Sequence, residues 1–312
     1  MQFIDSTAIT NKLAVNSLVE ALRDGFRSGC EMPVRHRHTL ERNGEPPASL
    51  VLMPAWQADG TLGVKMTTIV PGNVDRQLPS RWAIYVLFDP VTGEPTHALD
   101  GHTLTLHRTA AASALAATYL ARKDAKCLVM VGTGTLAPYL IKAHCAVRPI
   151  EKVAIWGRRP ERAQAVAAGR PAGDAVQHIV ATDLATAIRG ADIISCATLA
   201  SDPLVMGDWL SPGAHLDLVG GFTPSMREAD DEAIRRARIF VDKKESCLIE
   251  AGDLVQPIKA GILKPEDVAG DLFDLCRGTV EGRRSADEIT VFKSVGIAIE
   301  DLVAANLVAC TG

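Results

Sequence analysis

Two glycines lie between an apolar run and a segment with helical periodicity, in the stretch KCLVMVGTGTLAPYLIKAH from Lys126 to His144. The apolar run ends at Val131, and Gly132 and Gly134 follow it. Glycines at such a strand-to-helix turn let the backbone approach a pyrophosphate, whose charge is met by backbone N–H groups and the positive end of the helix. The fingerprint is partial, because Pro138 occupies the place of its third glycine. The turn therefore predicts dinucleotide binding, and an ordinary strand-to-helix turn is the alternative.

A pair of arginines follows the second strand of this expected nucleotide-binding unit. Gly157 stands at the end of that strand, where sites for NAD usually have Asp or Glu to hold the ribose 2′-hydroxyl. Arg158 and Arg159 come next, and guanidinium groups suit a 2′-phosphate. The pattern favours NADP(H), with NAD(H) possible. The alternative is a solvated basic pair in front of the helix that begins at Pro160.

Three cations nearer the start of the chain are candidates for binding an anionic substrate, namely Arg35, Lys65 and Arg108. Lys65 lies inside an otherwise apolar strand from Leu62 to Val70, so its ammonium group is expected to point towards a cleft. Arg108 is expected at the start of a helix, where a cation is unfavourable unless an anion is nearby. The alternative for each is an ordinary solvated cation.

The residues up to about Pro95 predict an α+β unit, because a helix from Thr10 to Gly29 precedes strand-like segments that short turns connect. The following part alternates strands and helices, as a doubly wound parallel sheet does. Its expected strands run from Lys126 to Val131, Lys152 to Trp156, Val176 to Val180, Ala191 to Cys196, His215 to Val219 and Arg238 to Val241. Its expected helices run from Thr109 to Ala121, Pro160 to Ala168, Asp183 to Gly190 and Ser225 to Ala237.

Composition excludes several classes of partner. The 312 residues carry a formal net charge of −4, with acids and bases interspersed, so neither nucleic acid nor an anionic membrane is expected as a partner. The 7 cysteines are scattered without a CxxC pair, and His36 and His38 have no further ligand at metal spacing, so neither disulfides nor a metal is expected. The chain shows no signal peptide and no apolar run as long as a membrane span, which predicts a soluble, cytoplasmic protein.

Eight motifs are spread along almost the whole chain: GVKMTTIVPGN, LFDPVTGEP, LHRTAAASALAATYLA, VGTGTLA, WGRRPERA, VGGFTPSMRE, EAGDLVQPI and DEITVFKSVGIAIEDL. Together they resemble the ornithine cyclodeaminase/mu-crystallin family. The resemblance implies an α/β protein with a Rossmann-type doubly wound parallel sheet domain, residues 113–294, which binds the dinucleotide. It also implies an α+β substrate-binding and dimerisation domain, residues 1–112 plus 295–312, and a homodimer formed through that domain.

The resemblance assigns roles to individual residues by position. Arg35, Lys65 and Arg108 correspond to a clamp for the substrate carboxylate, with Lys65 as the catalytic residue that supplies or relays a proton. Phe222 and Val295 correspond to further parts of the substrate site. The implied contacts to the cofactor come from Ser80, Arg108, Thr109, Gly132, Gly134, Thr135, Leu136, Arg158, Arg159, Thr198, Val219, Gly220 and Ser294.

One departure from the family pattern bears on the reaction. In ornithine cyclodeaminases the two glycines after the fifth strand precede an Asp, whereas Phe222 follows Gly220 and Gly221 here. Cyclodeamination needs a base for a charged δ-amine, a role that a carboxylate can fill and a phenyl ring cannot. The resemblance therefore implies an NADPH-preferring oxidoreductase that reduces small cyclic α-imino acids, of the Δ1-pyrroline-2-carboxylate or ketimine reductase type.

Three alternatives stay open at this point. Alanine dehydrogenase needs the same clamp and the same cofactor. Ornithine cyclodeaminase, an ammonia-lyase, would need another carboxylate such as Glu228 or Asp230 in place of the missing Asp. A non-enzymatic NADPH-binding protein, like the crystallin members of the family, would need the cofactor site alone.

Overall fold

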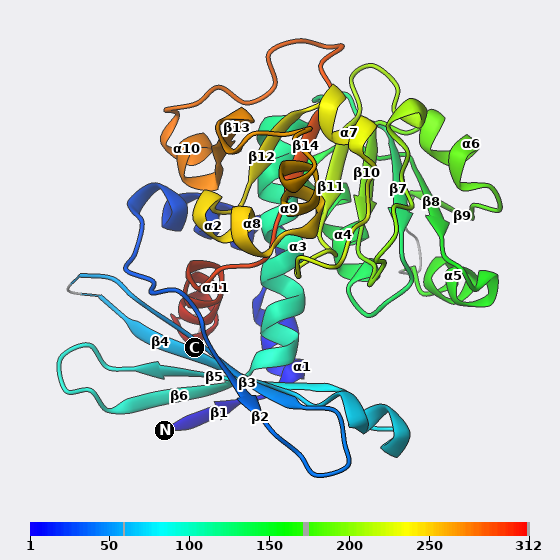
Figure 1. Ribbon diagram of the computed structural model, residues 1–312. Coiled ribbons are helices and arrows are strands. Elements are labelled where there is room, and N and C mark those ends of the chain that lie inside the picture. The colour runs from blue at the N-terminus through cyan, green and yellow to red at the C-terminus, as the bar shows by residue number, and fades with distance from the viewer. Residues whose placement is uncertain (59, 171–174, 311–312) are drawn as a thin grey trace. The chain divides into compact units, whose positions relative to one another are not determined.

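The computed structural model of the chain describes residues 1–58, 60–170 and 175–310. The chain forms two compact units (Figure 1). The first comprises Met1–Thr109 and Ile297–Gly312, and the second comprises Ala110–Gly296. Within the described residues, no helix is both long enough and apolar enough to cross a bilayer.

The first unit is built on a six-stranded sheet with the strand order β1-β6-β5-β4-β3-β2. Strands β2 to β6 pair antiparallel with their neighbours, and β1 pairs parallel with β6. The predicted antiparallel sheet thus has two additional strands at one side, β1 and β6. The six strands are β1 (Gln2–Ile4), β2 (His36–Leu40), β3 (Ala48–Trp56), β4 (Leu62–Ile69), β5 (Arg81–Phe88) and β6 (Pro95–Asp100).

Helix α11 (Ala298–Cys310) packs on strands β3, β4 and β5, and α2 (Val15–Ser28) packs on α11. The helix expected to begin near Thr10 is two helices, so this prediction was wrong. Thr10 lies inside α1 (Ser6–Lys12), whose start is fixed because the Asp5 side chain accepts the N–H of Ala8 at 2.8 Å.

Arg108 does not lie at a helix start, which corrects the prediction for this residue. Helix α3 (Gly101–Leu120) begins seven residues before it, where the Asp100 side chain accepts the N–H of Thr103 at 2.7 Å. The cap therefore lies upstream of the alanine-rich segment from which the helix was predicted. An anion near Arg108 must come from elsewhere in the unit.

The second unit contains an eight-stranded, wholly parallel sheet with the order β13-β12-β14-β11-β10-β7-β8-β9. The predicted doubly wound parallel sheet is confirmed, although two of its strands, β13 and β14, were not expected. Its strands are β7 (Cys127–Val131), β8 (Lys152–Trp156), β9 (Gln177–Val180), β10 (Ile193–Cys196), β11 (His215–Leu218), β12 (Arg238–Val241), β13 (Val268–Asp271) and β14 (Thr290–Lys293).

The helices of this unit follow most of the strands. The helix expected from Ser225 to Ala237 is α7, which covers only Asp231–Arg236, because Asp230 caps it by accepting the N–H of Ala233 at 2.9 Å. The further helices are α4 (Ala137–Val147), α5 (Pro160–Ala168), α6 (Leu184–Arg189), α8 (Lys244–Glu250), α9 (Gly252–Lys259) and α10 (Leu272–Arg277), with short 3₁₀ turns η1 (Pro71–Arg76) in the first unit and η2 (Gly207–Trp209) and η3 (Pro265–Asp267) in the second.

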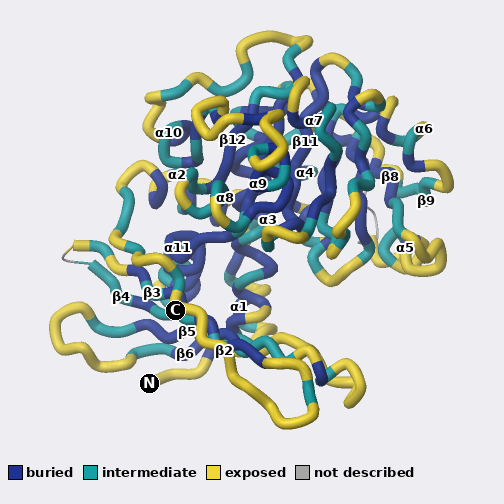
Figure 2. The backbone as a smooth tube through the Cα atoms, viewed as in Figure 1, coloured by how far each residue is buried: buried dark blue, intermediate teal, exposed yellow. Residues whose placement is uncertain are grey.

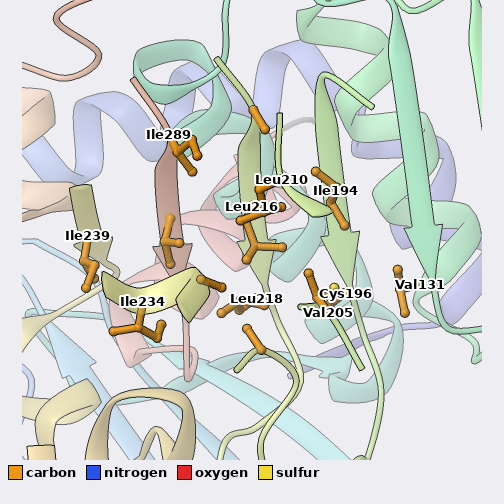
Figure 3. Close-up of a cluster of buried hydrophobic side chains, with 14 of the residues drawn as sticks. Val131, Ile194, Cys196, Val205, Leu210, Leu216, Leu218, Ile234, Ile239 and Ile289 are labelled. Carbon is orange, nitrogen blue, oxygen red and sulfur yellow. The ribbon is translucent and has the colours of Figure 1, made fainter. Parts of the chain in front are cut away.

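Buried aliphatic side chains from neighbouring strands form the core of the second unit (Figure 3). Leu216 and Leu218 of β11 lie beside Ile194 of β10, and Ile234 of α7 belongs to the same cluster. Figure 2 shows the central strands buried along their length. Parallel strands covered on both faces read as continuous apolar runs, which is why the sequence revealed most of them.

The strand order reverses between β7 and β10, where the chain turns from one half of the sheet to the other. Ligands of open α/β sheets bind outside the carboxyl ends of the strands at such a point. The loops that follow β7 and β10 are therefore the expected place for a dinucleotide.

Candidate functional site

The loop between β7 and α4 has the features of a phosphate-binding turn. Gly132 has a φ of +118°, and a Cβ there would lie 2.5 Å from the carbonyl oxygen of Ala197, so only glycine fits. No described residue accepts a hydrogen bond from the backbone N–H groups of residues 133–136. Helix α4 follows at once without a side-chain cap at Leu136. These donors and the helix N-terminus can meet the charge of a pyrophosphate.

The end of β8 lies against this loop. A Cβ at Gly157 would be 2.7 Å from Cγ2 of Thr133, so an acidic side chain at Gly157 would collide with Thr133. Arg158 and Arg159 follow and are exposed, and within the described chain their guanidinium groups have no hydrogen bond or ion pair. The pair is available for an external anion beside the glycine turn.

The loops after β10 and β11 are in close contact. A Cβ at Gly220 would lie 2.3 Å from the carbonyl oxygen of Thr198. The N–H groups of Val219 and Gly220 both donate to the carbonyl of Cys196, at 2.8 and 3.3 Å. A Cβ at Gly132 would also be 3.3 Å from Cγ2 of Thr198. The sequence-predicted cofactor residues of the second unit thus come together along one edge of the sheet.

A buried cluster of charged side chains supports these loops. Glu228 accepts hydrogen bonds from the N–H and the hydroxyl group of Thr198, at 2.7 and 2.8 Å. Lys293 pairs with Asp253 at 3.2 Å, and all three charged residues are fully buried. The sequence did not single out Lys293 or Asp253, because each is one polar residue in an ordinary motif segment.

The remaining residues predicted for the second unit have distinct surroundings. Ser294 is buried and Phe222 is half-buried. The N–H of Val295 donates to Oδ2 of Asp242 at 2.8 Å, and this carboxylate also accepts the N–H of Gly296 at 2.7 Å. Asp242 therefore fixes the backbone that carries Ser294 and Val295, a role the sequence did not reveal.

The first unit brings two of its predicted cations onto one shared carboxylate. Lys65 Nζ lies 2.6 Å from Oδ2 of Asp301, and Arg108 Nε lies 3.0 Å from Oδ1 of the same group. Arg108 Nη1 also donates to Glu300 at 2.6 Å. All four side chains are buried, and no described residue accepts from Arg108 Nη2. The Lys65 ammonium thus contacts a buried carboxylate.

The charges of this cluster act on each other strongly. Burial, followed by repulsion from Arg108, lowers the pKa of Lys65 to about 8, although Asp301 opposes the change. Arg35 contributes to the same lowering, so it lies near enough to act on Lys65. Burial works to raise the pKa of Asp301, but Arg108 and Lys65 outweigh it and hold that pKa below its usual range.

The sum of these charges indicates what the cluster can bind. Arg35, Lys65, Arg81 and Arg108 supply positive charge, and Arg81 is near enough to Arg108 for the two charges to repel. Glu300 and Asp301 supply two negative charges, so the cluster keeps a positive excess that suits a carboxylate ligand. A lysine with its pKa near neutrality can also exchange a proton with a bound ligand.

Two other predicted residues of this unit are placed less centrally. Ser80 is exposed just before β5, and its carbonyl accepts the N–H of Val70 at 2.7 Å. Thr109 is half-buried on α3, directly after Arg108. The described contacts of Ser80 and Thr109 do not connect them to the cluster.

Sequence reasoning missed Glu300 and Asp301. Both lie in the segment from Ile297 to Val308, whose other residues are almost all apolar. Two adjacent acids in such a segment are the signal that could have identified them, because acids are almost never buried without a partner.

The whole chain resembles known proteins. The model of the ornithine cyclodeaminase/mu-crystallin family matches residues 2–310. A Δ1-pyrroline-2-carboxylate reductase from Paracoccus denitrificans is 39% identical over 316 residues, covering 99% of this chain and 96% of that protein. The Thermococcus litoralis Δ1-pyrroline-2-carboxylate reductase in complex with NADH and L-proline superimposes with a TM-score of 0.92 and 32% identity, covering 99% and 96% of the two chains. An archaeal alanine dehydrogenase dimer with bound NAD has a TM-score of 0.88 and 28% identity, covering 99% and 94%.

Substitution of Asp301 tests whether it is the anion that stabilises the cation cluster. Asp301→Asn leaves Lys65 and Arg108 buried with less compensating charge, so we expect the free energy of unfolding to fall by about 3 kcal/mol or more. Urea unfolding near neutral pH measures this loss. Glu300→Gln is the matched control, because Glu300 bonds Arg108 but not Lys65, and its expected cost is about 1 kcal/mol. Equal losses in the two variants would contradict the central role of Asp301.

Proposed function

This chain belongs to the ornithine cyclodeaminase/mu-crystallin family, as its motifs predicted, and on that premise we propose that it is an NAD(P)H-dependent reductase of small cyclic α-imino acids. The substrate class is that of Δ1-pyrroline-2-carboxylate and its six-membered homologue. The observation that carries the proposal is the buried cluster of Lys65, Arg108, Asp301 and Glu300, in which one lysine and one guanidinium nitrogen remain able to serve a carboxylate and an imine.

The residues divide the reaction between them. Arg35 and Arg108 hold the substrate carboxylate through charge-assisted hydrogen bonds. A bound reduced nicotinamide cofactor supplies the hydride that the imine carbon takes up. Lys65 donates its proton to the imine nitrogen and is left neutral, so the C=N double bond becomes the C–N single bond of a saturated cyclic amino acid. The lowered pKa of Lys65 makes this proton easier to give up than that of an ordinary lysine.

The cofactor would be held by the second unit. The N–H groups of residues 133–136 and the N-terminus of α4 suit its pyrophosphate. Thr198, Val219, Gly220 and Ser294 come from loops at the same edge of the sheet and would serve the nicotinamide half. The residues of this unit would thus supply both the donors for the pyrophosphate and the loop contacts for the nicotinamide half.

The surroundings of two carboxylates argue against cyclodeamination. Glu228 is fully buried and accepts two hydrogen bonds from Thr198. Asp230 accepts the N–H groups of Ala233 and Gly207, at 2.9 and 2.8 Å. Both candidates for replacing the family's Asp are therefore engaged, and Phe222 supplies an apolar side chain at the position itself.

The relatives support a reductase. The Paracoccus denitrificans protein carries the name Δ1-pyrroline-2-carboxylate reductase, and the Thermococcus litoralis structure contains NADH and L-proline. L-Proline is the saturated counterpart of the five-membered imine. Both relatives are more similar in sequence to this chain than the archaeal alanine dehydrogenase is.

A Lys65→Met variant tests the proposed proton donor. With NADPH and Δ1-pyrroline-2-carboxylate, we expect kcat/KM to fall at least about 100-fold, while the Kd of the cofactor stays unchanged. In the natural enzyme, kcat/KM should decline as the pH rises through about 8, because Lys65 loses its proton there. Loss of NADPH absorbance measures kcat/KM for the variant and for the natural enzyme at each pH.

Lys12→Met is the control, because Lys12 bonds the carbonyl of Val308 at 3.1 Å in the same unit and has no proposed part in the reaction. Parallel assays with pyruvate plus ammonia and with ornithine separate the alternatives. Activity with pyruvate plus ammonia but not with the cyclic imine would instead identify an alanine dehydrogenase. Formation of proline and ammonia from ornithine would identify a cyclodeaminase.

We propose further that the enzyme prefers NADPH to NADH. Arg158 and Arg159 are exposed beside the glycine turn, where a 2′-phosphate could pair with them. Gly157 leaves no acid to hold a 2′-hydroxyl, and Thr133 fills the space that such an acid would need. The structural relatives contain NADH or NAD, so a nicotinamide dinucleotide is the cofactor class of those proteins. Arg158 and Arg159 would give this chain its preference for NADPH within that class.

Removing the arginines tests this preference. In the double variant Arg158→Ala and Arg159→Ala, we expect the KM for NADPH to rise about tenfold or more and the KM for NADH to stay unchanged, since only NADPH carries the lost charge partner. Steady-state kinetics with both cofactors measure the two values. Gly157→Asp alone should weaken binding of both cofactors, because its Cβ would press on Thr133. An equal rise of both KM values in the double arginine variant would refute the assignment.

We also propose that the protein forms a homodimer through the outer face of the first unit's sheet. Trp82 and Ile84 of β5 point to this face and are exposed, whereas Tyr85, which follows Ile84 and points to the opposite face, is fully buried. The register places Met66 opposite Ile84, and Leu52 opposite Met66. Such a continuous apolar face on an antiparallel sheet usually marks an interface. The archaeal alanine dehydrogenase of the same fold is described as a dimer.

Light scattering after size-exclusion chromatography tests the dimer. We expect twice the mass of one chain for the natural protein, and the mass of one chain for a double variant Trp82→Asp and Ile84→Asp, because burying two carboxylates in an apolar interface is costly. Val91→Asp is the control, since Val91 is 90% exposed in the turn between β5 and β6. A monomeric natural protein would disprove the proposal.

A further inference from the structure

The carboxylate of Glu228 lies beneath two of the loops assigned to the cofactor. One oxygen, Oε1, accepts both the N–H and the hydroxyl group of Thr198, at 2.7 and 2.8 Å. The other oxygen, Oε2, is buried and has no hydrogen-bond partner among the described residues. A Cβ at Gly220 would lie 2.4 Å from Oε1, so the backbone of the second loop rests directly on the carboxylate.

Lys293 and Asp253 hold this arrangement from below. Lys293 Nζ donates to the carbonyl of Leu218 at 3.1 Å and to the carbonyl of Gly220, and pairs with Asp253. Asp253 in turn accepts the N–H groups of Glu228 and Ala229, at 2.8 and 3.1 Å. The three side chains therefore connect the ends of β10, β11 and β14 with α9.

A purely structural cluster would not need this placement. The same unit contains another buried polar network, in which Asp217 accepts hydrogen bonds from Ser113 and Ser195 at 2.9 and 2.7 Å. That network joins α3 to strands within the sheet. The Glu228 network instead ends on the loop residues Thr198 and Gly220, at the edge where a nicotinamide would lie.

We propose that Glu228, held by Lys293 and Asp253, is a positioning residue that sets the Thr198 and Gly220 loops for the nicotinamide half of the cofactor. The inference rests on the proposed function, because it takes from it that these loops contact the cofactor. Glu228 touches neither substrate nor cofactor and acts through Thr198 and Gly220. Its loss is expected to change cofactor binding rather than substrate binding.

The surroundings of Glu228 make its action depend on pH. Burial raises the pKa of Glu228 to about 7, and Asp253 adds to the rise, while Lys293 and the two Thr198 donors oppose it. The groups that face it are Lys293 on β14, Asp253 on α9 and the buried thiol of Cys196 on β10. The ionised carboxylate is the stronger acceptor for Thr198, so the loops are held more firmly above pH 7 than below it.

The first test measures the Kd of NADH by fluorescence titration between about pH 6 and about pH 8. NADH is used because it lacks the 2′-phosphate, since phosphomonoesters ionise near pH 6 and would obscure the effect. We expect the natural protein to bind NADH about tenfold more tightly at the upper pH. Glu228→Gln keeps an acceptor oxygen for Thr198 but cannot ionise, so its Kd should not change across this range.

Matched variants separate positioning from general stability. Thr198→Val removes the hydroxyl donor and keeps the N–H, so it should reduce the pH dependence without abolishing binding. Ser113→Ala removes a buried hydrogen bond of the Asp217 network and should keep the natural pH dependence. Thermal unfolding of each variant verifies that it is folded at the assay temperature.

The outcomes are distinct. A pH dependence retained in Glu228→Gln, or lost equally in Ser113→Ala, would overturn the positioning role. In steady-state assays with the cyclic imine, Glu228→Gln should raise the KM for the cofactor several-fold and leave the KM for the imine unchanged; the reverse split would overturn it too. A natural protein that binds NADH with the expected pH dependence but reduces no imine supports the positioning role and refutes the substrate assignment alone.

Discussion

Asp301 is the anion on which the candidate substrate site depends. Buried cations are unstable without a partner, and Lys65 and Arg108 share this one carboxylate at 2.6 and 3.0 Å. Because both oxygens are used, Asp301 fixes the two cations relative to each other. Glu300 completes the arrangement on Arg108. The cluster can therefore keep an excess of positive charge and still be buried.

The same constraint recurs in the second unit with a different result. Lys293 is fully buried there, and Asp253 together with two backbone carbonyls satisfies its ammonium group. The network of Lys293 and Asp253 continues through Glu228 to the Thr198 loop. It therefore supports a loop and does not itself form a position for a ligand. In the first unit buried charge prepares a site for a ligand, and in the second it holds the loops that would contact one.

Close approach of backbones shapes the edge of the parallel sheet. Gly132, Gly157 and Gly220 each lie where a Cβ would come within 2.7 Å of a neighbouring loop. These contacts align the loops after β7, β8, β10 and β11 at the carboxyl ends of their strands. The local sequence shows that glycines are present, whereas only the packing shows that a side chain at Gly132 or Gly220 would collide with a backbone carbonyl oxygen.

The sequence by itself determined the local elements and the family. Continuous apolar runs revealed the central strands of the second unit, because parallel strands buried on both faces leave no polar alternation. The turn at Gly132 was visible because glycine is needed wherever φ is positive and backbones approach. Strand β14 was not visible, because four residues after a long loop carry little periodicity, although it lies between β11 and β12.

Only the tertiary structure decided the partners of the charged residues. Lys65 and Asp301 are 236 positions apart in the sequence, and no local pattern predicts which acid meets which cation. The sequence identified Lys65 and Arg108 as chemical candidates, but it placed Arg108 at a helix start and overlooked Glu300, Asp301, Asp253 and Lys293. The physical reason is that burial of a charge is decided by the far segment that packs against it, and that segment is brought there by the fold.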